Sequence, residues 1–200
     1  ELTKLLKVQA AKRDLKWEQQ FFANFPNAFV KISRPDPLQG PDGWPYLLVE
    51  IHEDAPEPVL DVIRWLGTRG IGMVVNPNQA TPDYVFSYGM LWNFIDDKKN
   101  QAEIHDGQQL FVGAPNEKYF PVYVRAIVRD FLKRQKALQP RVAMVSRDQK
   151  VFDLCFSLES LGSPPVSEHQ GILEALAWFF PLHYSLAILS EKVISGFSDL

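Results

Sequence analysis

The chain has 200 residues, 46% hydrophobic and 22% charged, so one large or two small globular domains are expected, and disordered, collagen-like and coiled-coil classes are excluded. The net charge of -3 lacks the excess of Lys and Arg found in nucleic-acid binders, and the single cysteine, Cys155, excludes a disulfide within the chain. We therefore expect no nucleic-acid partner and a cytoplasmic location, with the periplasm as the alternative because proteins there can also lack disulfides.

No membrane span is expected. The richest apolar stretch, 172–189, is interrupted by Glu174, Pro181 and His183, whereas a span needs about 20 apolar residues. The chain begins with Glu1 rather than Met, and whether a leader or upstream segment was cut away or left out stays open.

The first segment, 1–26, is expected to form an N-terminal helix. Residues 2–22 contain neither Gly nor Pro and are rich in Leu, Lys, Ala and Gln. Phe21, Phe22 and Phe25 crowd its end, and Pro26 stops it. We expect this aromatic end to insert into the main body.

Residues 27–113 are expected to contain a first ββαβ unit followed by an aromatic β segment. Two β-forming runs, 28–33 and 46–51, flank the loop 34–45, whose many Pro, Gly and Asp residues predict an exposed hairpin connection. Apolar residues at helical spacing then predict a helix over 59–66 and, after a glycine-containing break, a strand over 71–75.

The start of the 59–66 helix carries a capping pattern. Asp54 and Glu57 are placed as in a capping signal, and Pro56 is expected in the first turn.

The segment 84–95 is aromatic and is expected to be largely a strand. Alternate residues of a strand share a face, so its even-numbered aromatic residues would form a ladder, wide enough for a ligand wall or a partner surface. Core packing is the alternative. The candidate ligand or partner surface consists of Tyr84, Phe86, Tyr88, Trp92 and, from the Pro-rich loop, Trp44.

The segment 114–139 is expected to contain a long amphipathic connecting helix, because 119–135 carries apolar residues on one face and Arg and Lys on the other. A second ββαβ unit is expected over 140–200. A tight turn separates strands 141–146 and 151–158.

A capping box at Ser167 and Gln170 then opens the last helix. Pro181 ends this helix, and a strand follows over 184–189.

The two ββαβ units also resemble each other in sequence. Residues 59–66 and 172–179 match class for class, and an apolar strand follows each. Internal duplication is one interpretation, and chance similarity of amphipathic helices is the other. Either way, the elements predict an α+β fold with largely antiparallel sheets.

His52, Glu53 and Asp54 follow a strand, where a metal or an acid–base pair could be assembled. Against this, strand alternation directs His52 and Glu53 to opposite faces, and Asp54 is already assigned to the helix cap. No residue is therefore assigned to catalysis, to a cofactor or to a metal.

Cys155 is the other candidate for chemistry. Alternation over 151–158 places it with Asp153 and Ser157 on the more polar face, where an accessible thiolate could react. An inert thiol is the alternative, because no neighbouring cation lowers the pKa of Cys155.

The motifs of nucleotide, hydrolase, zinc and calcium sites are absent from the sequence, and no cofactor is expected. We expect a non-enzymatic protein-interaction module, such as an adaptor, a chaperone-like protein or an inhibitor, with homo-oligomerisation left open. One alternative is a regulatory domain holding a small molecule between the two units, and another is an enzyme with dispersed site residues.

Overall fold

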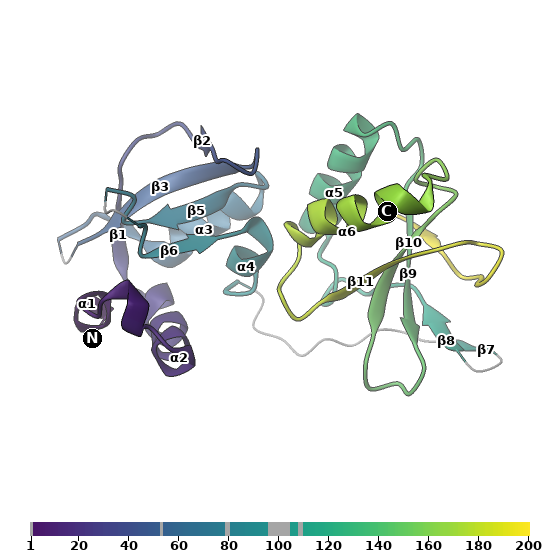
Figure 1. Cartoon of the computed structure of the whole chain (residues 1–200), viewed down its shortest axis with the longest axis horizontal. Coiled ribbons are helices and arrows are strands. Elements are labelled where there is room, and N and C mark those ends of the chain that lie inside the picture. Colours follow the sequence, from purple (N-terminus) through teal and green to yellow (C-terminus); the bar gives the residue numbers. More distant parts are fainter. Residues whose placement is uncertain (1, 53, 79–80, 96–104, 108–109) are drawn as a thin grey trace. The chain divides into compact units, whose positions relative to one another are not determined.

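The computed structural model describes residues 2–52, 54–78, 81–95, 105–107 and 110–200. The chain divides into two compact units, Glu1–Ile95 (unit 1) and Asp96–Leu200 (unit 2), and each contains one β-sheet (Figure 1). Helices and largely antiparallel sheets confirm the α+β class. Within the described ranges, no helix is both long and apolar enough to cross a membrane.

The N-terminal segment is not the single helix expected over 1–26. It forms α1 (Leu2–Leu6), a 3-10 turn η1 (Ala10–Lys12), α2 (Leu15–Asn24) and a second 3-10 turn η2 (Phe25–Asn27). The break has a local cause, because the Asp14 carboxylate accepts a hydrogen bond from Trp17 N at 2.8 Å and so begins a new helix.

Unit 1 contains the first ββαβ sequence. Its elements are β1 (Phe29–Ile32), β2 (Leu38–Gln39), β3 (Pro45–Ile51), β4 (Glu57–Pro58), α3 (Val59–Gly67), β5 (Gly72–Val75), β6 (Tyr84–Phe86) and α4 (Tyr88–Trp92). The strand order is β4-β1-β3-β5-β6, with β2 also paired to β3. The expected hairpin is confirmed, since β1 and β3 are antiparallel, whereas β3 and β5, joined through α3, are parallel.

The core of unit 1 is aromatic where the N-terminal segment meets the sheet. Trp17 stacks on Phe21 at 5.0 Å between ring centroids, Phe21 on Phe25 at 5.2 Å, and Phe25 on Phe86 at 4.9 Å. Phe21, Phe25 and Phe86 are completely buried. The expected insertion of the aromatic end of this segment is therefore confirmed.

Unit 2 contains the second ββαβ sequence. Its elements are β7 (His105–Gly107), β8 (Leu110–Gly113), α5 (Val122–Arg134), β9 (Arg141–Ser146), β10 (Asp153–Ser157), α6 (Val166–Ala177), β11 (Ser185–Leu189) and β12 (Ser198–Asp199). The strand order is β11-β10-β9-β8-β7, with β12 also paired to β9. Strand β8, grouped with 27–113 in the sequence, pairs instead with β9.

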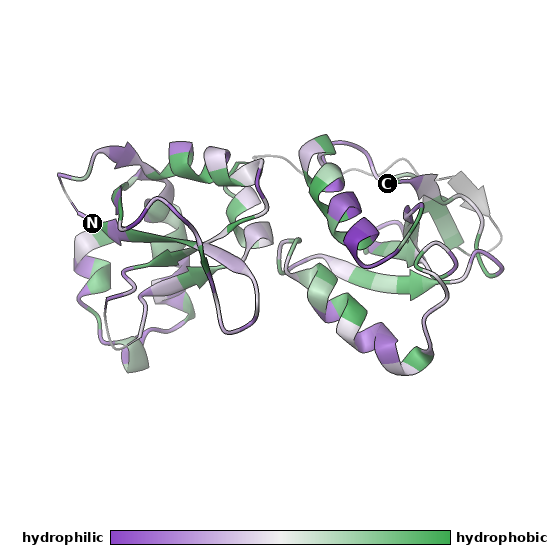
Figure 2. Cartoon of the chain, turned by 90° about the horizontal axis from the view of Figure 1, so that it is seen from above, coloured by the Kyte–Doolittle hydropathy of each residue, from purple (hydrophilic) through white to green (hydrophobic). Residues whose placement is uncertain are grey.

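Both faces of the unit 2 sheet are covered. On one face, Phe156 is completely buried and its ring lies 6.2 Å from that of Phe180, which follows α6. On the other face, Ile194 and Phe197 pack with Ala143 and Cys155. Figure 2 shows the resulting pattern, in which the two long helices of this unit alternate between apolar and polar residues.

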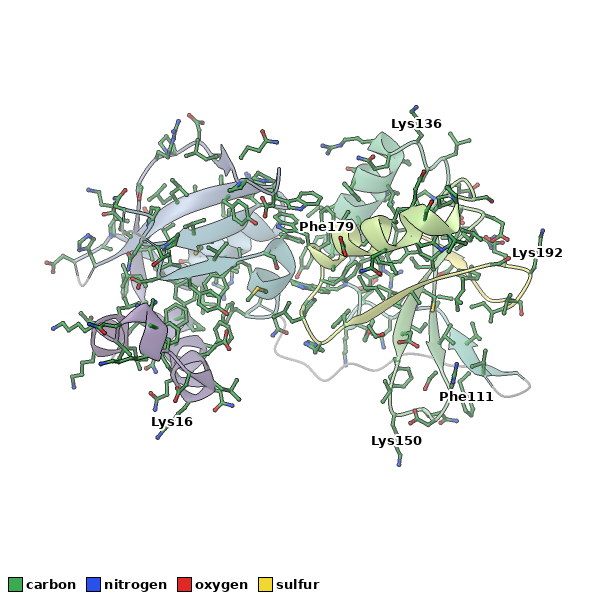
Figure 3. The ribbon with its side chains drawn as sticks, viewed as in Figure 1. Lys16, Phe111, Lys136, Lys150, Phe179 and Lys192 are labelled. Carbon is green, nitrogen blue, oxygen red and sulfur yellow. The ribbon has the colours of Figure 1, made fainter. Side chains whose placement is uncertain are left out.

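Side chains follow the same division between interior and surface. Figure 3 shows Lys16, Lys136, Lys150 and Lys192 extending away from the ribbon. Phe179, by contrast, is buried, and its ring lies 4.9 Å from that of Phe131.

The two expected helix caps are wrong. Helix α3 begins at Val59 with Pro58 at the N-cap, so Asp54 does not cap it and Pro56 lies outside it. Helix α6 begins at Val166 with Pro165 at the N-cap, so Ser167 already lies inside the helix. A proline in each case fixes the extended backbone that precedes the helix.

The two units share the connection order strand, antiparallel strand, helix, parallel strand. This agreement is one of topology, and internal duplication stays a hypothesis.

Candidate functional site

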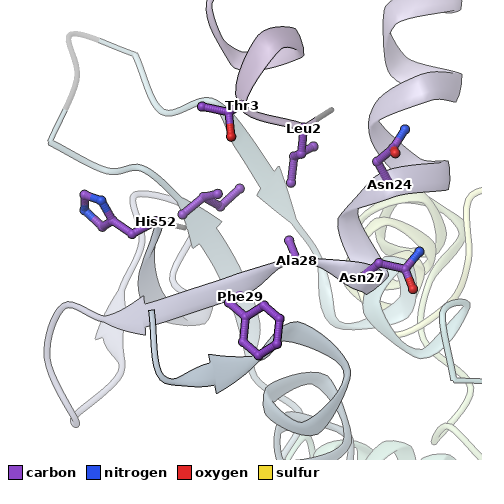
Figure 4. A pocket seen from close by; sticks show the side chains of 8 residues that line it. Leu2, Thr3, Asn24, Asn27, Ala28, Phe29 and His52 are labelled. Atoms are coloured by element: carbon purple, nitrogen blue, oxygen red, sulfur yellow. The ribbon is translucent and has the colours of Figure 1, made fainter. Parts of the chain in front are cut away.

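His52 lies beside two adjoining open pockets at the end of β3. The first, of about 370 Å³, is lined by Leu2, Thr3, Asn24, Asn27, Ala28, Phe29, Ile51 and His52 (Figure 4). The second, of about 530 Å³, shares Thr3, Ile51 and His52 and adds Lys31 and Asp54 among its lining residues.

The polar groups of these pockets do not converge on a common point. In Figure 4 the His52 imidazole points away from Leu2 and Ala28, and its side chain is 62% exposed. His52 Nε2 lies 3.5 Å from Glu50 Oε2, a surface contact. Glu53 lies outside the described residues. Across the part of the chain that is described, no group of three or more His, Cys, Asp or Glu could hold a metal ion.

The expected aromatic strand face over 84–95 is wrong, because only Tyr84–Phe86 is a strand and Tyr88–Trp92 is helical. The Ser87 side chain accepts a hydrogen bond from Met90 N and so caps this short helix. Phe86, Tyr88 and Trp92 are buried.

The two remaining members of the expected surface, Tyr84 and Trp44, are half-buried. The Tyr84 hydroxyl donates a hydrogen bond to Glu18. Burial, with this bond to the carboxylate, raises the pKa of Tyr84. Tyr84 therefore ties α2 to the sheet.

Cys155 does not lie on an accessible face. It is completely buried, since the segment carrying Ile194 and Phe197 covers its side of the sheet. Burial, and secondarily the nearby Asp153 carboxylate, raises the pKa of this thiol to about 12. The thiol therefore stays protonated at neutral pH, which agrees with the inert alternative.

A polar cluster holds the turn that follows β11. Glu191 accepts hydrogen bonds from the Ser157 hydroxyl at 2.5 Å and from Arg141 Nη1 at 2.6 Å. Glu159 accepts from the Ser190 hydroxyl at 2.5 Å and from Glu191 N at 2.8 Å. These bonds, that of Ser190 first, lower the pKa of Glu159. Because both carboxylates are used internally, the cluster serves to fix the end of β11.

Strand β11 itself ends the unit 2 sheet, with β10 as its neighbour in the strand order. Its five residues, Ser185–Leu189, include no charged residue and no proline. The other end strands of the two sheets are shorter: β4 has two residues, one of them Pro58, and β6 and β7 have three each. Charge, proline and short length are the usual devices that protect a sheet edge, and β11 carries none of them.

The register of the parallel pair determines which backbone groups of β11 lie on the outer edge. Leu189 is opposite Ser157, and Leu189 O accepts a hydrogen bond from Leu158 N at 2.9 Å. In a parallel ladder a residue directs its N–H and C=O to the same side, and successive residues alternate sides. Ser185, Ala187 and Leu189 therefore bond to β10, whereas Leu186 and Ile188 direct their N–H and C=O groups outward.

Local bonds limit this outer edge at both ends. Before the strand, Tyr184 N donates to Pro181 O at 3.0 Å, and after it, Ser190 O accepts from Val193 N at 2.9 Å. Leu186 and Ile188 are thus the residues through which the edge can bind another strand. The sequence predicted this strand, yet its place at the end of the sheet depends on pairing that no local pattern reveals.

No protein-family model, curated protein or solved structure matches this chain. A functional conclusion therefore rests on the geometry of the sheet edge and of the pockets.

Proposed function

We propose that the chain is a protein-interaction module that binds an extended segment of a partner protein along the outer edge of β11. The observation that carries this proposal is the five-residue apolar end strand, in which Leu186 and Ile188 direct their backbone groups outward. An adaptor, a chaperone-like protein or an inhibitor can use such an edge.

The chemistry is strand addition. Hydrogen bonds to the main chain of the bound segment provide affinity, and the side chains on the two faces of the extended sheet provide selectivity. Leu186 and Ile188 lie on one face, and Ser185, Ala187 and Leu189 lie on the other. The preferred segment is therefore rich in β-branched and apolar residues, with no proline where it bonds to β11.

The experiment measures binding of short fluorescent peptides rich in Val, Ile and Thr to the full chain, with proline-interrupted versions as controls. We expect the uninterrupted peptides to bind and Ile188→Pro to weaken binding about tenfold or more, since this substitution removes an outward N–H donor. Ala187→Pro is the matched control. It removes an N–H group that bonds to β10, so it lowers the stability of the sheet without removing an outward donor.

Equal binding of the interrupted and uninterrupted peptides would contradict strand addition. So would unchanged binding by an Ile188→Pro variant that keeps its thermal midpoint.

A further inference from the structure

We infer that the strand bound by β11 is β11 of a second copy of this chain, so that two copies join their unit 2 sheets into one continuous sheet. This inference rests on the proposed function and names the partner for the same edge. It follows from the register that the outward backbone groups permit.

Only one antiparallel register uses the outward groups of Leu186 and Ile188 without needing a backbone group that is already bonded within the chain. When Leu186 of one copy lies opposite Ile188 of the other, the two residues exchange both of their N–H to C=O bonds, and the two-fold axis repeats the pair. Sliding the strands to place Leu186 opposite Leu186 would require Tyr184 N, which already donates to Pro181 O. Sliding the strands the other way would place Ile188 opposite Ile188 and Leu186 opposite Ser190. This register would require Ser190 O, which already accepts from Val193 N.

The side chains fit the same register. The axis passes between the two Ala187 residues, which form a non-hydrogen-bonded pair, the arrangement in which Cα atoms approach most closely, to about 4.5 Å. Alanine suits this position because it brings only a methyl group. Leu186 and Ile188 then lie opposite each other on one face of the joined sheet, as an apolar cross-strand pair.

The carboxylate next to β11 does not oppose the pairing. Glu191 forms an ion pair with Arg141 of its own copy at 2.6 Å, so its charge is balanced without the partner.

The assembly closes at two copies through this edge. The pairing is isologous, so each copy contributes the same strand, and the outer edge of β11 is used up once the pair forms.

The test is sedimentation velocity of the full chain from micromolar to millimolar concentration, together with hydrogen exchange resolved to single amides. We expect a concentration-dependent dimer in which Leu186 and Ile188 N–H exchange more slowly as the concentration rises. The N–H groups of Ala187 and Leu189 bond to β10 and should be protected at every concentration. Ile188→Pro should weaken the dimer about tenfold to hundredfold, because it removes one donor from each copy.

Three outcomes would overturn the inference. If the chain stays monomeric yet binds extended peptides, the proposed strand addition stands and the inference that the bound strand is a second copy is wrong. If the chain stays monomeric and binds no extended peptide, both the proposed function and the inference of a second copy are wrong. A dimer in which exchange at Leu186 and Ile188 is independent of concentration uses another surface. The exchange measurement needs only the natural chain, so it decides the question even where Ile188→Pro fails to fold.

Discussion

At the scale of single residues, Arg13 and Asp83 form a buried ion pair in unit 1. Arg13 Nη2 lies 2.5 Å from Asp83 Oδ1, and the two side chains are only 12% and 1% exposed. Asn76 Nδ2 donates to the other carboxylate oxygen at 2.6 Å, and Asn76 Oδ1 accepts from Ile51 N at 2.8 Å. These bonds join the N-terminal segment, β3 and the segment before β6. Sequence patterns missed them because 70 positions separate Arg13 from Asp83.

Replacing one member of this pair should destabilise the fold strongly. We expect Asp83→Asn to lower the free energy of unfolding by about 3 kcal/mol, because a buried guanidinium would lose its counter-charge. Chemical denaturation followed by circular dichroism measures the change. The double variant Arg13→Met with Asp83→Leu should recover most of the loss.

The matched surface pair is Arg64 and Asp61, both more than 60% exposed. Arg64→Ala should cost less than about 0.5 kcal/mol. A loss as large as that of Asp83→Asn would mean that burial does not set the strength of the Arg13–Asp83 pair.

The buried Cys155 thiol should make stability depend on pH in the alkaline range. Burial raises the pKa of Cys155 to about 12, above the value of about 8.5 expected in the unfolded chain. The folded state therefore holds the thiol proton more tightly, and this contribution is complete below about pH 8.5 and is lost as pH rises toward 12. Tyr84 and Tyr119, whose pKa values burial also raises, add to the decline only above about pH 10.

The measurement is the urea midpoint at intervals from neutral pH to about pH 10. Cys155→Ala should be less stable at neutral pH because it loses buried volume, and its curve should be flatter above about pH 8.5. Parallel curves for the natural chain and Cys155→Ala would show that the thiol does not contribute to the pH dependence of stability.

At the scale of elements, sequence patterns located what local periodicity controls and missed what packing controls. The hairpins β1–β3 and β9–β10, the helix α3 and the helix α5 lie where alternation and helical spacing place them. Helix α4 was missed because its aromatic residues are typical of strands, whereas the Ser87 cap and burial of Tyr88 and Trp92 favour a helical turn.

Strand β5 illustrates how an element depends on close packing at one position. A Cβ at Gly72 would lie 2.6 Å from Phe86 O and 2.8 Å from the Tyr46 ring. Gly72 thus lets the Tyr46 ring lie against β5 while β6 pairs at its other side. Tyr46 is held from its far end by a hydrogen bond that its hydroxyl donates to Asp42.

Two glycine-to-alanine substitutions should therefore change the stability of the fold in opposite directions. Gly72→Ala should destabilise unit 1 by about 1–3 kcal/mol, because both contacts are shorter than van der Waals distance. Gly171→Ala, inside α6 with nothing within 4 Å of the added methyl group, should stabilise by about 0.5–1 kcal/mol. Thermal melts of the two variants beside the natural chain test this, and a stabilising Gly72→Ala would contradict the packing described here.

At the scale of the whole molecule, composition and element order were enough to predict an α+β chain with two ββαβ sequences and largely antiparallel sheets. Which strand ends each sheet was beyond reach, because strand order is a property of non-local pairing. The same holds for Cys155, since alternation assigned it a face correctly while the cover provided by Ile194 and Phe197 comes from a segment 39 or more positions away.

The burial of the single cysteine has a practical consequence for physical studies of this chain. A cysteine introduced at a well-exposed position, such as Leu138 at 90% exposure or Val193 at 70%, would be the fast-reacting thiol of the folded protein while Cys155 is left in place. Fluorophores or spin labels can therefore be attached at chosen sites without first removing a native thiol. Distances across unit 2, and between two paired copies, become directly measurable by resonance methods.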